Sequence, residues 1–330
     1  MGETKITVDE DTVHRYENAR YGIAGNHSAV QICSWNRKAL RGQGVCYKQK
    51  FYGIDCHRCA QMSPAFAFCQ ECCIHCWRPA EWMKRTSMEK YEVDGPQLII
   101  DETVKKRKIL VAGIGGAEDV KKDQFDESFR KFPSHWAISL SGEPTIYPRI
   151  GEMVSILRNN PEVRSIFIVS NGQEPHVFEK LKEKDQLPTQ LYISVTAPNE
   201  KLFKEFNRSV YPDGWQRLNK TLEMLSSLGC RTVIRFTLIR GVNDSNMQEF
   251  AALFEKSKPD FIEVKAYMYL GLSRDRLKKE NMAPHDYIKE WSEKLAELLP
   301  SYKIEDEDVR SRIVLFKRKD SAFDNFIKNP

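Results

Sequence analysis

The sequence has no apolar run that approaches the length of a membrane span, and its N-terminus lacks the basic and then apolar layout of a secretory signal. We therefore expect a cytosolic protein with no membrane association. An excess of one charge sign is also missing, because 51 basic and 46 acidic side chains leave a formal net charge of +5 over 330 residues. Basic residues do gather at 105–108, 274–279 and 317–319, and such runs fit either a polyanionic partner or an ordinary solvated face.

Cysteine is nearly absent outside one short segment of the chain. Eight of the nine cysteines lie between residues 33 and 76, and only Cys230 lies elsewhere. In a reducing compartment, such crowding indicates metal binding rather than disulfide bonds.

Two metal sites compete for these cysteines. A zinc ribbon would use Cys56-x2-Cys59 and Cys73-x2-Cys76, with a slightly short central spacing. In the other interpretation, Cys69-x3-Cys73-x2-Cys76 places three thiolates on one short loop, and each binds one iron of a 4Fe-4S cube. The fourth iron then has no protein ligand, which is what a chelating cofactor needs.

The pattern after residue 63 favours the cluster. Short β-rich runs alternate with helical patterns, as in βα units around a parallel sheet, and they predict six strands, at 64–68, 135–140, 163–169, 190–195, 231–239 and 260–268. A polar or glycine-containing turn follows each of the first five strands, beginning at Cys69, Ser141, Ser170, Thr196 and Arg240. The C-terminal strand ends of a βα barrel share one rim, so these turns should form one site. A zinc ribbon predicts none of this organisation.

The cysteine triad, the Gly-Glu-Pro turn after the second strand and the βα pattern together resemble the radical S-adenosylmethionine (SAM) enzymes. The resemblance covers residues 63–270 and implies an α/β fold, a partial (βα)6 TIM-like barrel. A cysteine-rich N-terminal extension (1–62) precedes it, and a C-terminal α/β addition (271–330) would pack on the barrel. The resemblance also implies that SAM chelates the open iron and is cleaved reductively to a 5'-deoxyadenosyl radical.

The same resemblance suggests which residues bind SAM. Ser141, Gly142 and Glu143 resemble the Gly-Gly-Glu turn that meets the SAM amino group, with serine in place of the first glycine. Asn171 and Ser194 end the third and fourth predicted strands, at positions that resemble contacts to the ribose and carboxylate of SAM.

The N-terminal region resembles one particular radical SAM family. Cys33, Cys46 and Cys59 recur at intervals of thirteen residues, and Trp77–Arg78 follows the SAM-type triad. With the Ser-Gly-Glu-Pro-Thr segment, this is similar to the tRNA 4-demethylwyosine synthases of the wybutosine pathway, in their archaeal form. The resemblance implies that the three upstream cysteines hold a second 4Fe-4S cluster, and that Lys48 forms a Schiff base with pyruvate.

The family resemblance implies a reaction and its partners. Two pyruvate carbons would add by radical chemistry to N1-methylguanosine-37 of tRNA(Phe), closing a third ring, as a carbon-carbon lyase and synthase. An α-keto acid can chelate an open iron or condense with a lysine amine, so pyruvate would bind the upstream iron, Lys48 or both. The base would be splayed out of the anticodon loop. We expect an external electron donor and a monomer.

Several residues have plainer interpretations. Cys56 and Cys72 fit neither triad and are expected to be bystanders, and Cys230 a small core residue. Without the family match, Lys50 is as plausible an amine as Lys48. Two rival functions are a zinc-dependent RNA-binding module fused to an α/β domain, and a different radical SAM enzyme with an auxiliary cluster.

Overall fold

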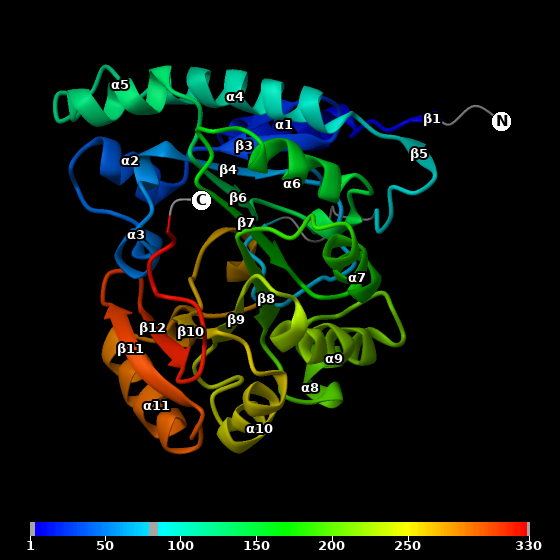
Figure 1. The fold of residues 1–330 in the computed structure, drawn as a ribbon, viewed down its shortest axis with the longest axis vertical. Coiled ribbons are helices and arrows are strands. Elements are labelled where there is room, and N and C mark those ends of the chain that lie inside the picture. Colours follow the sequence, from blue (N-terminus) through cyan, green and yellow to red (C-terminus); the bar gives the residue numbers. More distant parts are fainter. Residues whose placement is uncertain (1–3, 79–84, 329–330) are drawn as a thin grey trace.

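A single ten-stranded sheet organises the computed structural model, which describes residues 4–78 and 85–328. Its six central strands are parallel and adjacent in chain order: β4 (Cys59–Ser63), β6 (His135–Ile138), β7 (Ser165–Ser170), β8 (Gln190–Val195), β9 (Arg231–Leu238) and β10 (Phe261–Ala266). Parallel neighbours need crossover connections, and helices supply them on the outside of the sheet (Figure 1). This is the expected partial (βα)6 barrel.

Antiparallel strands extend both edges of the parallel set. β3 (Ser28–Gln31) pairs with β4 and β2 (Gly22–Ala24) with β3, while β12 (Ile313–Arg318) pairs with β10 and β11 (Tyr302–Asp308) with β12. The two outermost strands, β2 and β11, are not paired with each other, so the barrel stays open. Strand β12 is therefore internal to the sheet, with β11 at its edge. A separate parallel pair joins β1 (Thr4–Lys5) to β5 (Tyr91–Glu92).

Helices cover the outer face of this sheet. Helix α4 packs along β2 to β4 with α5 beside it, and Figure 1 shows α7 to α9 beside β7 and β8, and α11 against β10 to β12. The bounds are α1 (Glu10–Asn18), α2 (Ser34–Leu40), α3 (Tyr47–Tyr52), α4 (Pro96–Ala112), α5 (Lys122–Arg130), α6 (Ile150–Arg158), α7 (Pro175–Glu183), α8 (Glu200–Phe206), α9 (Gly214–Met224), α10 (Met247–Ser257) and α11 (His285–Glu297). Across the described ranges, none of these helices has the length and apolarity needed to cross a membrane.

Five of the six predicted strands are confirmed, and the first was wrong. Residues 64–68 form a buried turn, and the first barrel strand is β4, which ends at Ser63. Pro64 cannot donate a ladder hydrogen bond, and the Ser63 hydroxyl instead accepts a hydrogen bond from the Ala65 amide at 3.1 Å. The apolar side chains of the run are buried all the same, because they pack in the main core.

The barrel strands alternate between two cores. Ile166 and Ile168 of β7 belong to the main core, which lies between the sheet and the outer helices, whereas Phe167 belongs to a second cluster. This alternation is the two-residue period of a strand whose faces are both buried. The second cluster also contains Tyr192 of β8 and Tyr47 of α3. Helix α3 therefore packs against the inner face of the barrel, with the outer helices on the opposite face.

Candidate active site

The predicted SAM-type triad lies on the loop that follows β4, at the C-terminal rim of the barrel. Burial, and then the negative charge of Glu71, raise the pKa of Cys69 and Cys73 well above the ordinary thiol value. Burial also raises the pKa of Cys76. The three thiols influence one another's ionisation, which places them within electrostatic reach of each other.

The Ser141-Gly142-Glu143 turn is fixed directly against this loop. Gly142 has a φ of 68°, and a Cβ atom there would collide with the carbonyl oxygens of Ala65 and Phe68. The Glu143 amide donates to the Phe68 carbonyl at 2.7 Å, and the Ser141 hydroxyl donates to the Phe66 carbonyl at 2.8 Å. Serine in place of the family's first glycine thus adds a hydrogen bond that ties the turn to the rim.

The Glu143 carboxylate joins the ends of β6 and β7. It accepts hydrogen bonds from the Thr145 hydroxyl at 2.6 Å, the Ser170 hydroxyl at 2.8 Å and the Asn171 amide at 2.7 Å. Burial raises its pKa, and these donors offset part of that effect. The Asn171 side chain in turn donates to Gln70 at 3.3 Å, so the turn, the strand ends and the cysteine loop form one connected network.

All eight residues predicted for the SAM site line one pocket of about 330 Å³: Cys69, Cys73, Cys76, Ser141, Gly142, Glu143, Asn171 and Ser194. Within residues 4–78 and 85–328, polar atoms without hydrogen-bond partners also belong to residues of this pocket, namely Glu71 Oε1, His75 Nδ1 and two guanidinium nitrogens of Arg78. Burial lowers the pKa of His75 to about 4, so its imidazole is neutral and can lie against an aromatic base. These features suit a polar cofactor with an adenine ring.

The upstream cysteines gather at the start of three elements. Cys33 precedes α2 and its sulfur accepts the Asn36 amide at 3.4 Å, Cys46 precedes α3, and Cys59 begins β4. The Asn36 side chain donates to the Cys59 carbonyl at 3.1 Å, which ties α2 to β4. Burial, and then the neighbouring Cys33 thiol, raise the pKa of Cys46, and the same two causes raise that of Cys59 to about 12.

Lys48 is buried inside the barrel, next to these thiols. Its Nζ atom lies 4.2 Å from the ring centroid of Phe167 and 4.3 Å from that of Tyr192. Burial, and then the positive charge of Arg235, lower its pKa to about 8. Lys50, the alternative amine, is 46% exposed and forms an ion pair with Asp306 at 2.7 Å. The structure therefore places Lys48 in the barrel and Lys50 at its surface.

Arg235 is a site residue that sequence reasoning missed. It lines the SAM-type pocket, and its charge also acts on Lys48. Its guanidinium donates to the fully buried Glu263 carboxylate at 2.9 and 3.0 Å, and Tyr47 and Tyr52 donate to the same carboxylate at 3.1 and 2.7 Å. The available signal was a charged residue between the apolar neighbours Ile234 and Phe236 of a predicted barrel strand, because such a residue must have a buried partner.

The cysteines form two groups, and the zinc ribbon is not one of them. Within the parts of the chain that the structure describes, no three His, Cys, Asp or Glu side chains converge closely enough to hold a single ion. Cys56 lies beside the upstream thiols, where burial and then Cys33 raise its pKa to about 11, while Cys73 and Cys76 lie with Cys69. The ligands of a cubane each bind a different iron, so they stand further apart than the ligands of one zinc ion.

Both cysteine triads have the chemistry that an iron-sulfur cluster requires. Thiolates are the usual ligands of such clusters, and all nine cysteines of the chain are free thiols. A buried thiol is costly to ionise alone, and coordinated iron supplies the compensating positive charge. The residues present therefore fit the cofactors that the sequence predicts.

Comparison with known proteins gives the same result from the whole sequence. The pattern of the Radical SAM superfamily matches residues 63–254, and that of wyosine base formation matches residues 256–318. The S-adenosyl-L-methionine-dependent tRNA 4-demethylwyosine synthase of Pyrococcus abyssi is 42% identical over 322 residues, which cover 96% of this chain and 93% of that protein. The synthase of Methanocaldococcus jannaschii is 37% identical over 321 residues, which cover 94% and 97%.

Solved structures agree with these relatives. A structure of TYW1 with a lysine-pyruvate adduct bound matches with a TM-score of 0.84 and 35% identity, covering 96% of this chain and 98% of that one. A crystal structure of archaeal TYW1 matches with a TM-score of 0.78 and 32% identity, covering 97% and 100%. Membership of the radical SAM superfamily implies a 4Fe-4S cluster and SAM as cofactors. This chain belongs to the tRNA 4-demethylwyosine synthase family.

Proposed function

We propose that this protein is a radical SAM synthase that condenses two carbons of pyruvate with N1-methylguanosine of tRNA(Phe), forming the tricyclic base 4-demethylwyosine. The observation that carries the proposal is the position of Lys48. Its amine lies inside the barrel, within the electrostatic reach of Cys46 and Cys59 on one side and of Arg235, which lines the SAM-type pocket, on the other. Family membership supports the same reaction.

We assign the cofactors to the two cysteine groups. Cys69, Cys73 and Cys76 would hold the cluster that binds SAM, and Cys33, Cys46 and Cys59 would hold a second 4Fe-4S cluster with an open iron. Ser141, Gly142, Glu143, Asn171 and Ser194 would contact SAM, which is supported by their common pocket. When bound, the reduced cluster and SAM supply a 5'-deoxyadenosyl radical that takes hydrogen from the N1-methyl group of the base.

Lys48 would bind and orient pyruvate. Its amine nitrogen attacks the C2 carbonyl, a C–N bond forms and the carbonyl oxygen leaves as water, so that C2 becomes part of a Schiff base. The rings of Phe167 and Tyr192 confine the amine from beneath and exclude water from it. Arg235 is held by Glu263 at the junction between Lys48 and the SAM-type pocket, where it can pair with the pyruvate carboxylate.

The remaining parts of the proposal follow from this chemistry. Only two of the three pyruvate carbons enter the base, so its C1–C2 bond must break and C1 leaves as a one-carbon product, which makes the enzyme a carbon-carbon lyase as well as a synthase. We propose a monomer in the cytosol, where tRNA and reduced thiols occur together, with electrons from an external donor. Residues 1–62 would form the extension for the second cluster, 63–270 the radical SAM core and 271–330 a unit that packs on the barrel.

The test compares two neighbouring lysines on one short helix. The chain is reconstituted without oxygen and given reductant, SAM, tRNA(Phe) with N1-methylguanosine, and pyruvate labelled at C2 and C3. Digested nucleosides are then examined by mass spectrometry for a tricyclic base that carries both labels. We expect Lys48→Ala to lower product formation by roughly three orders of magnitude, because the covalent anchor is lost. Lys50→Ala should leave it unchanged, because Lys50 is a surface ion-pair residue.

SAM cleavage in the absence of tRNA is the control for an intact radical site, and Lys48→Ala should retain it. A product that lacks the labels, or equal activity of the two lysine variants, would contradict the assignment of pyruvate to Lys48. Cleavage of SAM by the wild-type chain without any change in tRNA would favour a different radical SAM enzyme with an auxiliary cluster.

A further inference from the structure

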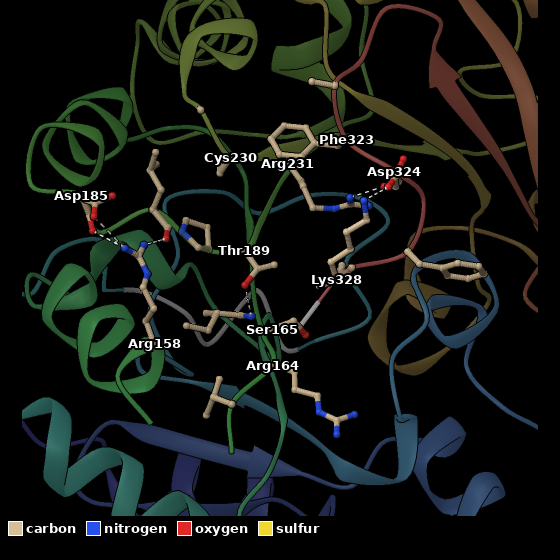
Figure 2. Close-up of a pocket in the computed structure, with 18 residues that line it drawn as sticks. Arg158, Arg164, Ser165, Asp185, Thr189, Cys230, Arg231, Phe323, Asp324 and Lys328 are labelled. Atoms are coloured by element: carbon tan, nitrogen blue, oxygen red, sulfur yellow. Dashed lines mark hydrogen bonds and ion pairs between the residues drawn. The ribbon is translucent and has the colours of Figure 1, made fainter. Parts of the chain in front are cut away.

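The segment that follows β12, residues 319–328, closes the barrel at the end opposite the SAM-type pocket. Figure 1 shows it running from β12 back past α3. It bounds a pocket of about 510 Å³ that is lined on one side by the first residues of β7 and β9, and on the other by residues of the segment itself (Figure 2). Lys319, Ser321 and Asn325 hydrogen-bond to Ser301, Asp260 and Glu305 beside β10 and β11, and two further attachments reach toward α3 and the lysine site.

Arg231, the first residue of β9, makes the first attachment. Its guanidinium donates to the backbone carbonyls of Asp324 at 2.5 Å and Asn325 at 2.8 Å, and Figure 2 shows it reaching toward the segment at Asp324. Its third donor binds the Gln190 side-chain carbonyl at 2.8 Å. One buried arginine therefore joins the segment to the starts of two barrel strands.

Gln190 continues this connection to the lysine site. Its amide nitrogen donates to the Tyr192 hydroxyl at 2.7 Å, and the Tyr192 ring lies under the Lys48 amine at 4.3 Å from ring centroid to Nζ. Two side chains, Arg231 and Gln190, thus connect the segment to the ring that supports Lys48.

A second attachment holds the helix that carries Lys48. The Ile327 amide donates to the carbonyl of Tyr52, the last residue of α3, at 3.0 Å. The ring of Phe326 lies over Gly53, where the chain leaves α3 with a φ of 72°. Phe323 and Ile327 also pack against the second core cluster, which contains the aromatic residues of α3.

We propose that residues 319–328 are a positioning element for the pyruvate site: they fix α3 and Tyr192 so that the Lys48 amine stays at the pyruvate carbonyl. The inference rests on the proposed function. Helix α3 has only six residues, too few to be stable alone, so contacts at its ends decide where Lys48 lies. A displacement of about 1 Å in a reacting group can cost on the order of 100-fold in rate.

The test releases the segment and measures pyruvate capture. In the full chain, Phe323→Ser with Ile327→Ser removes its apolar attachment, and borohydride trapping reports the fraction of Lys48 that holds pyruvate. We expect the pyruvate concentration for half-maximal trapping to rise by roughly tenfold or more. SAM cleavage without tRNA should stay unchanged, and Ile327→Val should behave as wild type. Lys328→Ala is the matched control, because the Lys328 side chain is exposed and forms its ion pair with Asp324 inside the same segment.

Arg231→Lys is a second variant that tests the same attachment if the double variant misfolds. Lysine keeps the positive charge but lacks the forked guanidinium that donates to two carbonyls. Wild-type trapping in both variants would overturn the inference. Parallel loss of trapping and SAM cleavage in both would also overturn it, because the segment would then serve general stability. If the wild-type chain itself traps no pyruvate, the proposed function fails and not this inference.

Discussion

Gly142 illustrates how a single position can decide whether the cofactor pocket forms. Its backbone is in the left-handed region, and its missing side chain lets the turn approach two carbonyl oxygens of the loop that precedes the triad. A glycine in a Gly-Glu-Pro turn is visible in the sequence. The reason for it is not, because Ala65 and Phe68 are far away along the chain.

We predict that Gly142→Ala abolishes SAM binding, while Gly229→Ala does not. Both glycines have positive φ values, 68° and 85°, so both substitutions carry a backbone cost of about 1 kcal/mol. Only Gly142 adds a collision with backbone, since no atom of the described residues lies within 4 Å of a Cβ atom at Gly229. Equilibrium dialysis with SAM and a thermal melt on each variant separate the two effects. Equal SAM affinity in both variants would show that the close approach has no role.

Arg235 and Glu263 show what the sequence could not provide. Each was visible as a charge between apolar neighbours of a strand, but their pairing depends on the register in which Arg235 lies opposite Glu263 on adjacent strands. Register is a tertiary property, set by how whole strands pack. The cysteines and Lys48 could be identified because a spacing pattern or a family match names them, whereas a buried ion pair has no pattern of its own.

At the scale of elements, the basic run at 105–108 lies on α4. One of its residues, Arg107, is not part of a solvated face. Lys105 and Lys108 are exposed, but Arg107 is fully buried. Its guanidinium donates to the carbonyls of His57 at 2.9 Å, Cys59 at 3.0 Å and Ser128 at 2.6 Å. It therefore ties α4 and α5 to the residue that begins β4, which is a proposed cluster ligand.

We predict that Arg107→Met lowers the free energy of unfolding by about 3 kcal/mol or more, because three buried carbonyls each lose a charged donor. Lys108→Ala, one residue away on the exposed face, should change it by less than about 0.5 kcal/mol. Urea unfolding of the two variants, followed by circular dichroism, measures both values. Equal urea midpoints in the two variants would mean that water replaces the guanidinium as the donor to these carbonyls.

Element boundaries were predictable where the period was long and strong. The strand expected at 190–195 has the same bounds as β8. The first barrel strand was missed because its five residues, Cys-Ala-Gln-Met-Ser, contain no β-branched or aromatic side chain. Its neighbours β3 and β6 hold it in the sheet, and this tertiary pairing outweighs its low local propensity.

On the scale of the whole molecule, β4 separates the two proposed clusters. Cys59 begins the strand, and the SAM-type triad follows its C-terminal end, so the upstream thiols and the rim loop lie at different levels of one barrel. The βα alternation was enough to predict the barrel. It was not enough to predict that α3 packs inside, because six residues are too few to show a helical period. The inward packing of α3 places Lys48 between the upstream cysteines and the rim loop that carries the SAM-type triad.

This arrangement predicts two independent clusters, which iron and sulfide quantitation on anaerobically reconstituted chain can separate. We expect about eight irons per chain in the wild type, from two four-iron cubes, and about four in each of Cys33→Ala and Cys69→Ala. Cys33→Ala should still cleave SAM without tRNA, because the rim site is intact, and Cys69→Ala should not. Cys230→Ala is the control, because that thiol lines the pocket at the opposite end of the barrel and should leave eight irons. An unchanged iron content in Cys33→Ala would remove the second cluster, and zinc in the wild-type chain would remove both.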